Sequence, residues 1–275
     1  MFSNSRDLWG MVTIITGASD GIGKELAKTL SALGGRLVLS ARRREKLEEL
    51  DQQIVGEHSM VSADVSQLSD CRNIIDVAMK QYGRIDTLIC CAGFGRAQPL
   101  ETMSHQDIQY LLATNLGGTI ECCRLAIPIM KSQDECNGYR GQIGIVSSAC
   151  ALRGVSHLSI YSASKSAQRG FAESLRVELR SAKIAVTGIY PGTVDTPFFK
   201  KMADSSMNPT AYVPGHKQSP EIVAEAIVES IRHPCPEVWP KPFSRMALIA
   251  SACVPRLTDW VMSGMSRRFL RDNKL

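Results

Sequence analysis

The chain has 275 residues and a mass of 30.1 kDa, which fits one large domain or two small ones around a substantial core. Hydrophobic residues make up 44% and charged residues 21% of it, values that argue against a collagen, a coiled coil, a disordered chain and a multispan membrane protein. The formal net charge is only +5, and the basic excess lies after residue 240. The charge therefore predicts no nucleic-acid partner but one locally basic end.

Nine cysteines form no C-x-x-C pair, and no Cys/His spacing resembles a zinc site. We interpret them as reduced, mostly buried thiols, and predict no metal. Arg6 and Asp7 interrupt the N-terminus before an apolar leader could form, and no run of 18 apolar residues occurs. These features predict a cytoplasmic protein without a spanning helix.

Short apolar runs alternate with amphipathic stretches in chain order. Strands are predicted at 11–16, 37–39, 60–64, 87–91, 143–146, 184–189 and 237–239. Helices are predicted at 22–33, 42–54, 68–82, 105–130, 160–181 and 219–232. This alternation is typical of an α/β protein with a single Rossmann-type domain, a doubly wound parallel sheet with helices on both faces. We place this domain at 1–240, with a substrate loop at 193–220 and a basic, apolar extension at 241–275.

A glycine-rich turn follows the first strand and opens the first helix. Its glycines are Gly17, Gly21 and Gly23, in the run T-G-A-S-D-G-I-G. Glycine lets the backbone turn sharply and approach a pyrophosphate, and the helix N-terminus offers free N–H groups. The turn predicts a dinucleotide cradle made of Gly17, Ser19, Asp20, Gly21, Ile22 and Gly23. The alternative is a tight turn that needs glycine only for packing.

The end of the second strand indicates which nucleotide would bind. In dinucleotide folds an acidic residue there binds the ribose 2′-hydroxyl of NAD, but here Ala41 is followed by arginines. A guanidinium can hold a 2′-phosphate with paired hydrogen bonds, which favours NADP(H). Arg42 is the first candidate and Arg43 the second. The alternative is that both arginines begin a solvated helix.

Four polar residues form a candidate catalytic set. Tyr161 and Lys165 stand at i and i+4, which places them on one helix face. Ser148 lies 13 residues earlier, just after a predicted strand, and Asn115 lies in the preceding long helix. Ser147 as the hydroxyl, and an Asn115 that only pins its helix, are the open alternatives.

These motifs resemble the short-chain dehydrogenase/reductase (SDR) family. The spacing G-x-x-x-G-x-G, the Ser, Tyr-x-x-x-Lys and Asn set, and P-G-x-V-x-T at 191–196 occur in the family's order, and the resemblance spans about 11–235. The chain departs from the family where N-N-A-G is usual, because it has Cys90-Cys91-Ala92-Gly93. The resemblance implies further cofactor contacts by Ser40, Asp64, Val65, Ala92, Gly93, Pro191, Gly192, Val194 and Thr196. It also implies a homodimer or homotetramer that pairs through the helices near 105–130 and 160–181.

The catalytic set suits hydride transfer to a carbonyl. Tyrosine is protonated at neutral pH but is a sluggish acid, so Lys165 and the positive nicotinamide are expected to lower the pKa of Tyr161. Ser148 is expected to hold the carbonyl oxygen. By resemblance, Lys165 also holds the nicotinamide ribose, Asn115 positions a relay water, and Val194 and Thr196 anchor the carboxamide.

The predicted substrate side is mostly apolar, which indicates a lipid-like or ring-bearing substrate. Its candidates are Ser148, Leu152, His157, Phe198 and Phe199. A core-capping Phe198 and Phe199, and a structural His157, are the alternatives.

The apolar extension is too short and too charged to span a membrane. It could contact an anionic membrane surface peripherally through 246–271, cover a substrate channel, or pack against another subunit. Its character resembles the lipid- and steroid-acting SDR branches, including 3-ketosphinganine reductases.

These observations predict an NADPH-dependent ketone reductase, or in reverse a secondary-alcohol dehydrogenase, that acts on a hydrophobic small molecule. A non-catalytic NADP(H)-binding regulatory protein is the alternative from another class. An intact Ser148, Tyr161 and Lys165 set argues against it, because a pure sensor needs no acid.

Overall fold

The computed structural model describes residues 5–198 and 217–272, with side chains up to residue 264. Its centre is a seven-stranded sheet in the order β3-β2-β1-β4-β5-β6-β7, and every pairing is parallel. The strands are β1 (Val12–Thr16), β2 (Arg36–Ala41), β3 (His58–Ser62), β4 (Thr87–Cys90), β5 (Gly141–Val146), β6 (Ile184–Ile189) and β7 (Glu237–Val238). The predicted doubly wound fold is confirmed.

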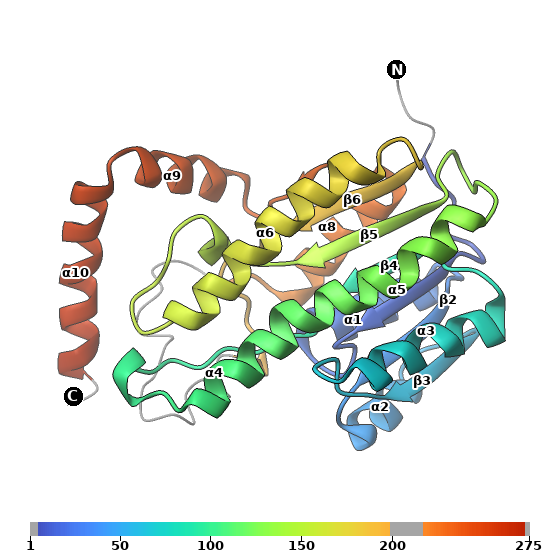
Figure 1. The fold of residues 1–275 in the computed structure, drawn as a ribbon, viewed down its shortest axis with the longest axis horizontal. Helices are drawn as coiled ribbons and strands as arrows, with labels where there is room; N and C mark the ends of the chain where they lie inside the picture. Colours follow the sequence, from blue (N-terminus) through green and yellow to red (C-terminus); the bar gives the residue numbers. More distant parts are fainter. Residues whose placement is uncertain (1–4, 199–216, 273–275) are drawn as a thin grey trace.

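Helices cover both faces of this sheet (Figure 1). The helices of the main body are α1 (Gly21–Ala32), α2 (Arg44–Asp51), α3 (Leu68–Tyr82), α4 (His105–Leu112), α5 (Gly118–Ser132), α6 (Ser159–Leu179) and α8 (Pro220–Arg232). One buried cluster joins α1, α2 and α8 to the sheet, and a second joins α3, α5 and α6 to it. Successive side chains of a strand point to opposite faces, so Ile14 belongs to one cluster and Ile15 to the other. The strands inside the sheet are mostly apolar because both of their faces are covered.

The predicted helix 105–130 is interrupted. A π-helical turn at Ala113–Gly117 separates α4 from α5. The backbone carbonyl of Asn115 accepts hydrogen bonds from Gln168 Nε2 (2.7 Å) and Thr119 Oγ1 (2.8 Å). Side chains that insert into the helical hydrogen-bond ladder are a known cause of such distortions. The bond from Gln168 therefore explains the break, and it ties α6 to this helix.

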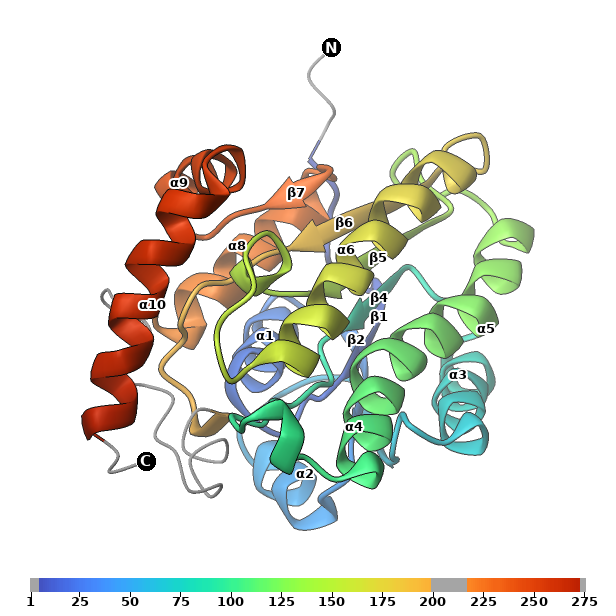
Figure 2. The same cartoon turned by 60° about the vertical axis from the view of Figure 1, so that its left-hand side comes forward.

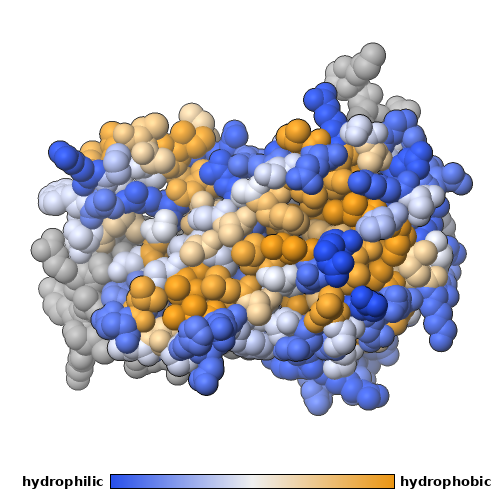
Figure 3. All heavy atoms as spheres, in the orientation of Figure 1, coloured by the Kyte–Doolittle hydropathy of each residue, from blue (hydrophilic) through white to orange (hydrophobic). Residues whose placement is uncertain are grey.

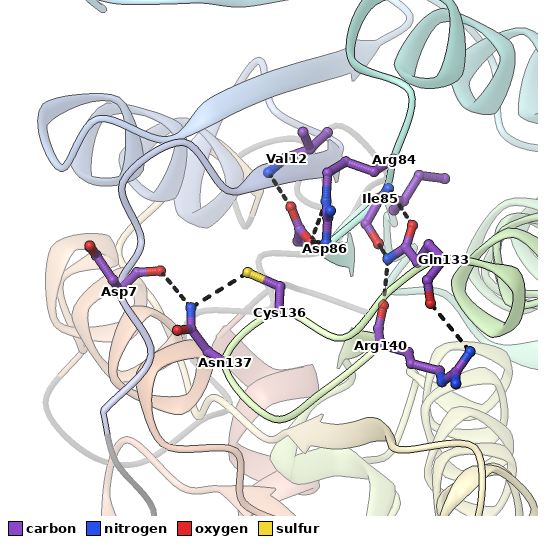
Figure 4. A network of polar contacts seen from close by, with 9 residues as sticks. All are labelled: Asp7, Val12, Arg84, Ile85, Asp86, Gln133, Cys136, Asn137 and Arg140. Carbon is purple, nitrogen blue, oxygen red and sulfur yellow. Dashed lines mark hydrogen bonds and ion pairs between the residues drawn. The ribbon is translucent and has the colours of Figure 1, made fainter.

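A polar network closes the edge of the sheet opposite the carboxyl ends of the strands (Figure 4). The buried carboxylate of Asp86 accepts from Val12 N (2.9 Å) and from Arg84 (2.7 Å). The side chain of Gln133 pairs with both backbone groups of Ile85. The bonds of Gln133 thus satisfy both backbone polar groups of Ile85, just before β4 begins.

Two more helices follow the body, α9 (Pro242–Cys253) and α10 (Pro255–Asp272), and we call residues 242–272 the C-terminal arm. Figures 1 and 2 show the arm standing beside the body rather than on the sheet. The sequence predicted no helix here. No residue of α9 is buried, and an ion pair between Arg153 and Asp259 links α10 to the body. Within the described segments, no helix combines the length and apolar content needed to span a membrane.

Candidate active site

One cavity of about 900 Å³ lies at the carboxyl ends of the strands. The strand order reverses there between β1 and β4, which is where open α/β sheets bind ligands. The cavity runs from the ends of β2 and β3, past the glycine turn, to β5, α6 and the arm. Nearly all residues predicted for the cofactor line it; Gly23 does not.

The glycines of the turn after β1 are required by close contacts. A Cβ on Gly17 would lie 2.8 Å from the backbone of Ala92, and the φ of Gly17 is +72°. A Cβ on Gly23 would lie 2.3 Å from the carbonyl of Gly17, so Gly23 lets the helix pack on the turn instead of facing a ligand. The side chain of Asp20 caps α1 by accepting from Gly21 N (3.0 Å). A backbone cradle at a helix N-terminus fits a pyrophosphate.

Although Cys90 and Cys91 stand where N-N-A-G is usual, the end of β4 is still hydrogen-bonded to β1. Thr16 Oγ1 accepts from the backbone N–H groups of Cys91 and Ala92 at 3.2 Å each, which fixes the end of β4 against β1. The thiol of Cys91 lines the cavity, and burial raises its pKa to about 12. Ala92 and Gly93 also line the cavity.

The two arginines after β2 have different partners. Arg43 forms an ion pair of 3.0 Å with Asp20, so its charge is shared with a carboxylate. Arg42 instead donates to the hydroxyl of Tyr110, and its guanidinium lies 5.6 Å from the centre of that ring. Arg42 therefore contacts a neutral group and is better suited to an anionic ligand. Ser40, Asp64 and Val65 line the same region.

The structure brings Ser148, Tyr161 and Lys165 together in the cavity wall, with exposed fractions of 8%, 8% and 5%. Ser148 directly follows β5 and begins the 3₁₀ turn η3 (Ala149–Ala151), whereas the other two lie one turn apart on α6. The ammonium of Lys165 donates to Val146 O (3.0 Å) and Gln168 Oε1 (2.9 Å). Ser147 is not placed to supply the catalytic hydroxyl, because its own hydroxyl donates to Lys165 O (2.8 Å).

Burial shifts the pKa values of both groups. It raises the pKa of Tyr161, and a hydrogen bond with Ser148 only partly opposes this. It also lowers the pKa of Lys165 to about 8. The ammonium of Lys165 is held by Val146 and Gln168, 5.7 Å from the centre of the Tyr161 ring. Without a bound cofactor, these surroundings favour the protonated form of Tyr161.

Asn115 is fully buried and does not line the cavity, although its neighbour Thr114 does. Its amide accepts from Phe94 N (2.9 Å) and donates to Phe94 O (2.9 Å) and Ser164 Oγ (3.1 Å). The side chain thus pins the loop after β4 to α6. This geometry favours the alternative in which Asn115 has a structural role.

Only some of the predicted substrate residues line the cavity. Phe198 lines the cavity, with its ring centre 5.9 Å from that of Tyr161. Leu152 and His157 do not line it: the backbone turns after η3, and the carbonyl of His157 accepts from Gln98 N (2.9 Å) to hold a neighbouring loop. Val155 and Leu158 line it instead, beside Arg153. Phe199 and residues 199–216 of the predicted substrate loop lie outside the described residues.

The largest group missed from the sequence comes from the arm. Leu248 and Ser251 of α9, and Thr258 and Met262 of α10, line the cavity. Their spacings of three and four residues are the signal that could have found them, because such residues share one helix face. The sequence leaves three roles open for the extension 241–275: membrane contact, cover of a substrate channel and subunit packing. This placement favours the cover of a substrate channel.

The chain is similar to several known proteins. The family model described as short chain dehydrogenase matches residues 11–206. Sepiapterin reductase of Chlorobaculum tepidum is 30% identical over 233 residues, which cover 81% of this chain and 91% of that protein. The 11-beta-hydroxysteroid dehydrogenase 1A of Arabidopsis thaliana is 35% identical over 199 residues, 70% of this chain but only 54% of the plant protein.

Two solved structures share the fold. A short chain dehydrogenase/reductase from Burkholderia phymatum in complex with NAD superposes with a TM-score of 0.81 at 22% identity, covering 91% of this chain and 96% of that one. The 3-ketoacyl-(acyl-carrier-protein) reductase from Brucella melitensis, complexed with NADH, gives 0.72 at 29% identity, with 82% and 92% covered. Motifs, fold and likenesses agree, and the chain is an oxidoreductase of the short-chain dehydrogenase/reductase family.

Proposed function

We propose that this protein transfers hydride between NADP(H) and a ketone or secondary alcohol of an apolar substrate, with Tyr161 as the general acid and base. One observation carries the proposal: Ser148, Tyr161 and Lys165 are buried in the wall of the same cavity that the glycine cradle and Arg42 line. A cofactor lying along the cradle would reach this polar group.

The residues of the cavity fit a dinucleotide in every part. The backbone at Gly17 and Gly21 leaves no room for a side chain and suits the pyrophosphate, and the carboxylate of Asp64 suits an adenine amine. Arg42, with Ser40 and Arg43, would hold a 2′-phosphate, Lys165 the ribose, and a last group the carboxamide: Pro191, Gly192, Val194 and Thr196. When bound, NADPH supplies the hydride.

The chain's own residues would control the proton. Ser148 is placed to donate a hydrogen bond to the carbonyl oxygen, where negative charge develops as the carbon gains hydride. The raised pKa of Tyr161 keeps its proton available for that oxygen at neutral pH. Lys165, with a pKa of about 8, can then return a proton to the tyrosinate near neutral pH. In the oxidative direction Tyr161 would accept the proton of the alcohol after passing its own proton to Lys165, whose amine is neutral above a pH of about 8.

The lining supports an apolar substrate with rings or a long chain. Beyond Tyr161 the side chains are mostly apolar: Val155, Leu158, Phe198, Leu248 and Met262. The name of one relative, 11-beta-hydroxysteroid dehydrogenase, points to an apolar ring system, whereas that of the other, sepiapterin reductase, points to a ring-bearing but polar substrate.

Titration of the purified protein with NADPH and with NADH, followed by nicotinamide fluorescence, tests the cofactor. We expect clearly tighter NADPH binding, which the variant Arg42→Ala should lose. The solved structures with NAD and NADH make this a strict test, because equal or tighter NADH binding would contradict the role of Arg42.

The variant Tyr161→Phe tests the chemistry. Loss of the phenol proton should lower ketone reduction by about 10²–10⁴-fold and leave NADPH binding within about twofold. Ketones with rings or long chains are screened first, in the reductive direction. A wild-type protein that binds NADPH but reduces none of them would favour the regulatory protein.

A further inference from the structure

The C-terminal arm carries more than half of the strongly exposed large apolar side chains of the described chain. Of the thirteen large apolar side chains exposed there, seven belong to the arm: Phe243, Met246, Ile249, Val254, Leu257, Trp260 and Val261. Phe243 is 89% and Trp260 71% exposed. Figure 3 shows apolar surface gathered over α9 at the upper left. An apolar patch of this size marks a contact with a membrane or another protein.

The body covers only one side of the arm. A narrow stripe along the two helices, Leu248, Ser251, Thr258 and Met262, lines the cavity, and no residue of α9 is buried. Isolated helices of 12 and 18 residues are marginal in water, and packing of an apolar face normally stabilises them. The arm therefore requires a second apolar surface on its outer side.

The charge of the arm favours one kind of surface. Among the described side chains of the arm, the only acidic one is that of Asp259, which pairs with Arg153. Of the two bases, Arg245 pairs with Glu237 of β7 at 3.1 Å, and Arg256 is exposed. The sequence adds Arg267, Arg268, Arg271 and Lys274 against Asp272. Two copies packed arm to arm would bring like charges together, which is unfavourable. Apolar and aromatic side chains among basic ones are typical of helices that lie on anionic lipid.

We propose that the outer face of the arm docks on an anionic lipid surface, so that the inner stripe forms a cavity wall next to the lipid. An apolar substrate dissolved in the lipid then has a short path to Tyr161. This path rests on the proposed function, whereas docking does not.

Flotation of the full chain with phosphatidylcholine vesicles, with and without phosphatidylserine, tests the docking. We expect binding to the phosphatidylserine vesicles that weakens with salt, and much weaker binding to the neutral ones. The variant Phe243→Ser/Trp260→Ser should bind at least about tenfold more weakly. The matched control Trp9→Ser/Val177→Ser removes two side chains of similar exposure, 76% and 77%, outside the arm and should bind like the wild type.

Unchanged binding by the arm variant, or no binding to either vesicle, would overturn the proposal. Light scattering after size exclusion identifies the other occupant: if the arm variant dissociates an oligomer, a second copy covers the arm and the lipid proposal is wrong. No step measures turnover, so failure here is distinct from failure of the reductase chemistry.

A separate observation concerns Tyr110 on α4, which links two groups of the cofactor region. Its hydroxyl donates to Asp64 Oδ2 (2.7 Å) and accepts from Arg42. A phenol has one proton, so it can bridge a carboxylate and a guanidinium in only this sense. Burial would raise the pKa of Asp64, but hydrogen bonds from Tyr110 and Ser66 and the charge of Arg42 hold it below its usual value. The ring of Tyr110 packs on Phe94, with the centres 5.4 Å apart.

From this geometry we infer that Tyr110 is a positioning residue for cofactor choice, an inference that rests on the proposed function. It holds Arg42 in the cavity wall and keeps Asp64 ionised, although it does not itself line the cavity. Without the hydroxyl, the long side chain of Arg42 loses its anchor and the advantage of NADPH over NADH falls.

Titration of Tyr110→Phe with both cofactors tests this inference. We expect NADPH binding to weaken about tenfold and NADH binding to change by less than twofold, with kcat unchanged. Tyr139→Phe, which alters a tyrosine outside the cavity, is the control. Equal weakening of both cofactors would mean a merely structural role, and unchanged NADPH binding would also overturn the inference. A wild type without NADPH preference contradicts the proposed function instead.

Discussion

Two walls of the same cavity are built in opposite ways. The wall from β5 and α6 holds Tyr161 and Lys165 in the buried body, with hydrogen bonds to backbone and buried side chains. The wall from the arm is half exposed, contains no buried residue in α9, and is linked to the body by ion pairs of Arg153 with Asp259 and of Arg245 with Glu237. The groups proposed for catalysis are thus held by the core, whereas the proposed substrate wall of the arm lies outside it.

The largest expected effect tests how strongly the ammonium of Lys165 is buried in the body. Burial lowers the pKa of Lys165 to about 8 from its usual 10.5. Between pH 8 and 10 the unfolded chain therefore binds more protons at this amine than the folded one, so the free energy of unfolding rises with pH. Relative to Lys165→Met, the wild type should gain about 2 kcal/mol over this window, measured by urea unfolding.

The control for this prediction is Lys183→Met, because Lys183 is 57% exposed. Its stability curve should run parallel to that of the wild type. Tyr161, whose pKa is raised, would lower the stability only above pH 10 and does not disturb the comparison. If the free energies of unfolding of the wild type and of Lys165→Met changed in parallel with pH, the amine of Lys165 would be more hydrated than its burial indicates.

An intermediate effect is expected where the arm meets the body. Arg153→Ala removes the ion pair with Asp259 and should raise the KM for an apolar ketone about fivefold, with kcat unchanged. Asp259→Ala should reproduce the effect through the same pair. Arg124→Ala, which breaks a pair on the surface of α5, is the control. A fall in kcat would instead place Arg153 with the catalytic group.

The smallest expected effect tests whether the body and the arm unfold as separate units. Gly170 in α6 and Gly264 in α10 are helical glycines at which a Cβ would meet nothing within 4 Å. Gly170→Ala should stabilise the body by about 1 kcal/mol and raise its Tm by about 2–4 °C. Gly264→Ala should leave that Tm unchanged, because the arm adds little to the cooperative core. An equal rise for both would make the arm part of the body.

The sequence predicted the elements of the body where local signals decide them. The helix 68–82 agrees with α3 to the residue, and Gly83 ends it with a φ of +70°. The break before α5 could not be predicted, because Gln168, 53 residues away, causes it. The arm helices were missed although Pro242 and Pro255 stand at helix starts, where proline is common, and although the arm's cavity-lining residues have helical spacings of three and four.

The same distinction holds for the site. The glycine turn and the pair Tyr161 and Lys165 follow from short, fixed spacings within one element. The direction of a side chain in the irregular loop between η3 and α6 does not, and for that reason Leu152 and His157 were assigned wrongly to the lining. Tyr110 lies 46 residues from Asp64, and only the packing of α4 beside the ends of the strands brings the two together.

The strand order also determines how the sheet can form while the chain is synthesised on the ribosome. β1 is made first but lies inside the sheet, so the sheet grows outward from it on both sides. β4 ends at Cys90, and its next neighbour β5 begins only at Gly141. At about 5–20 residues per second, this apolar edge stays unpaired for several seconds of translation. The nascent chain is therefore prone to aggregate while this stretch is being synthesised.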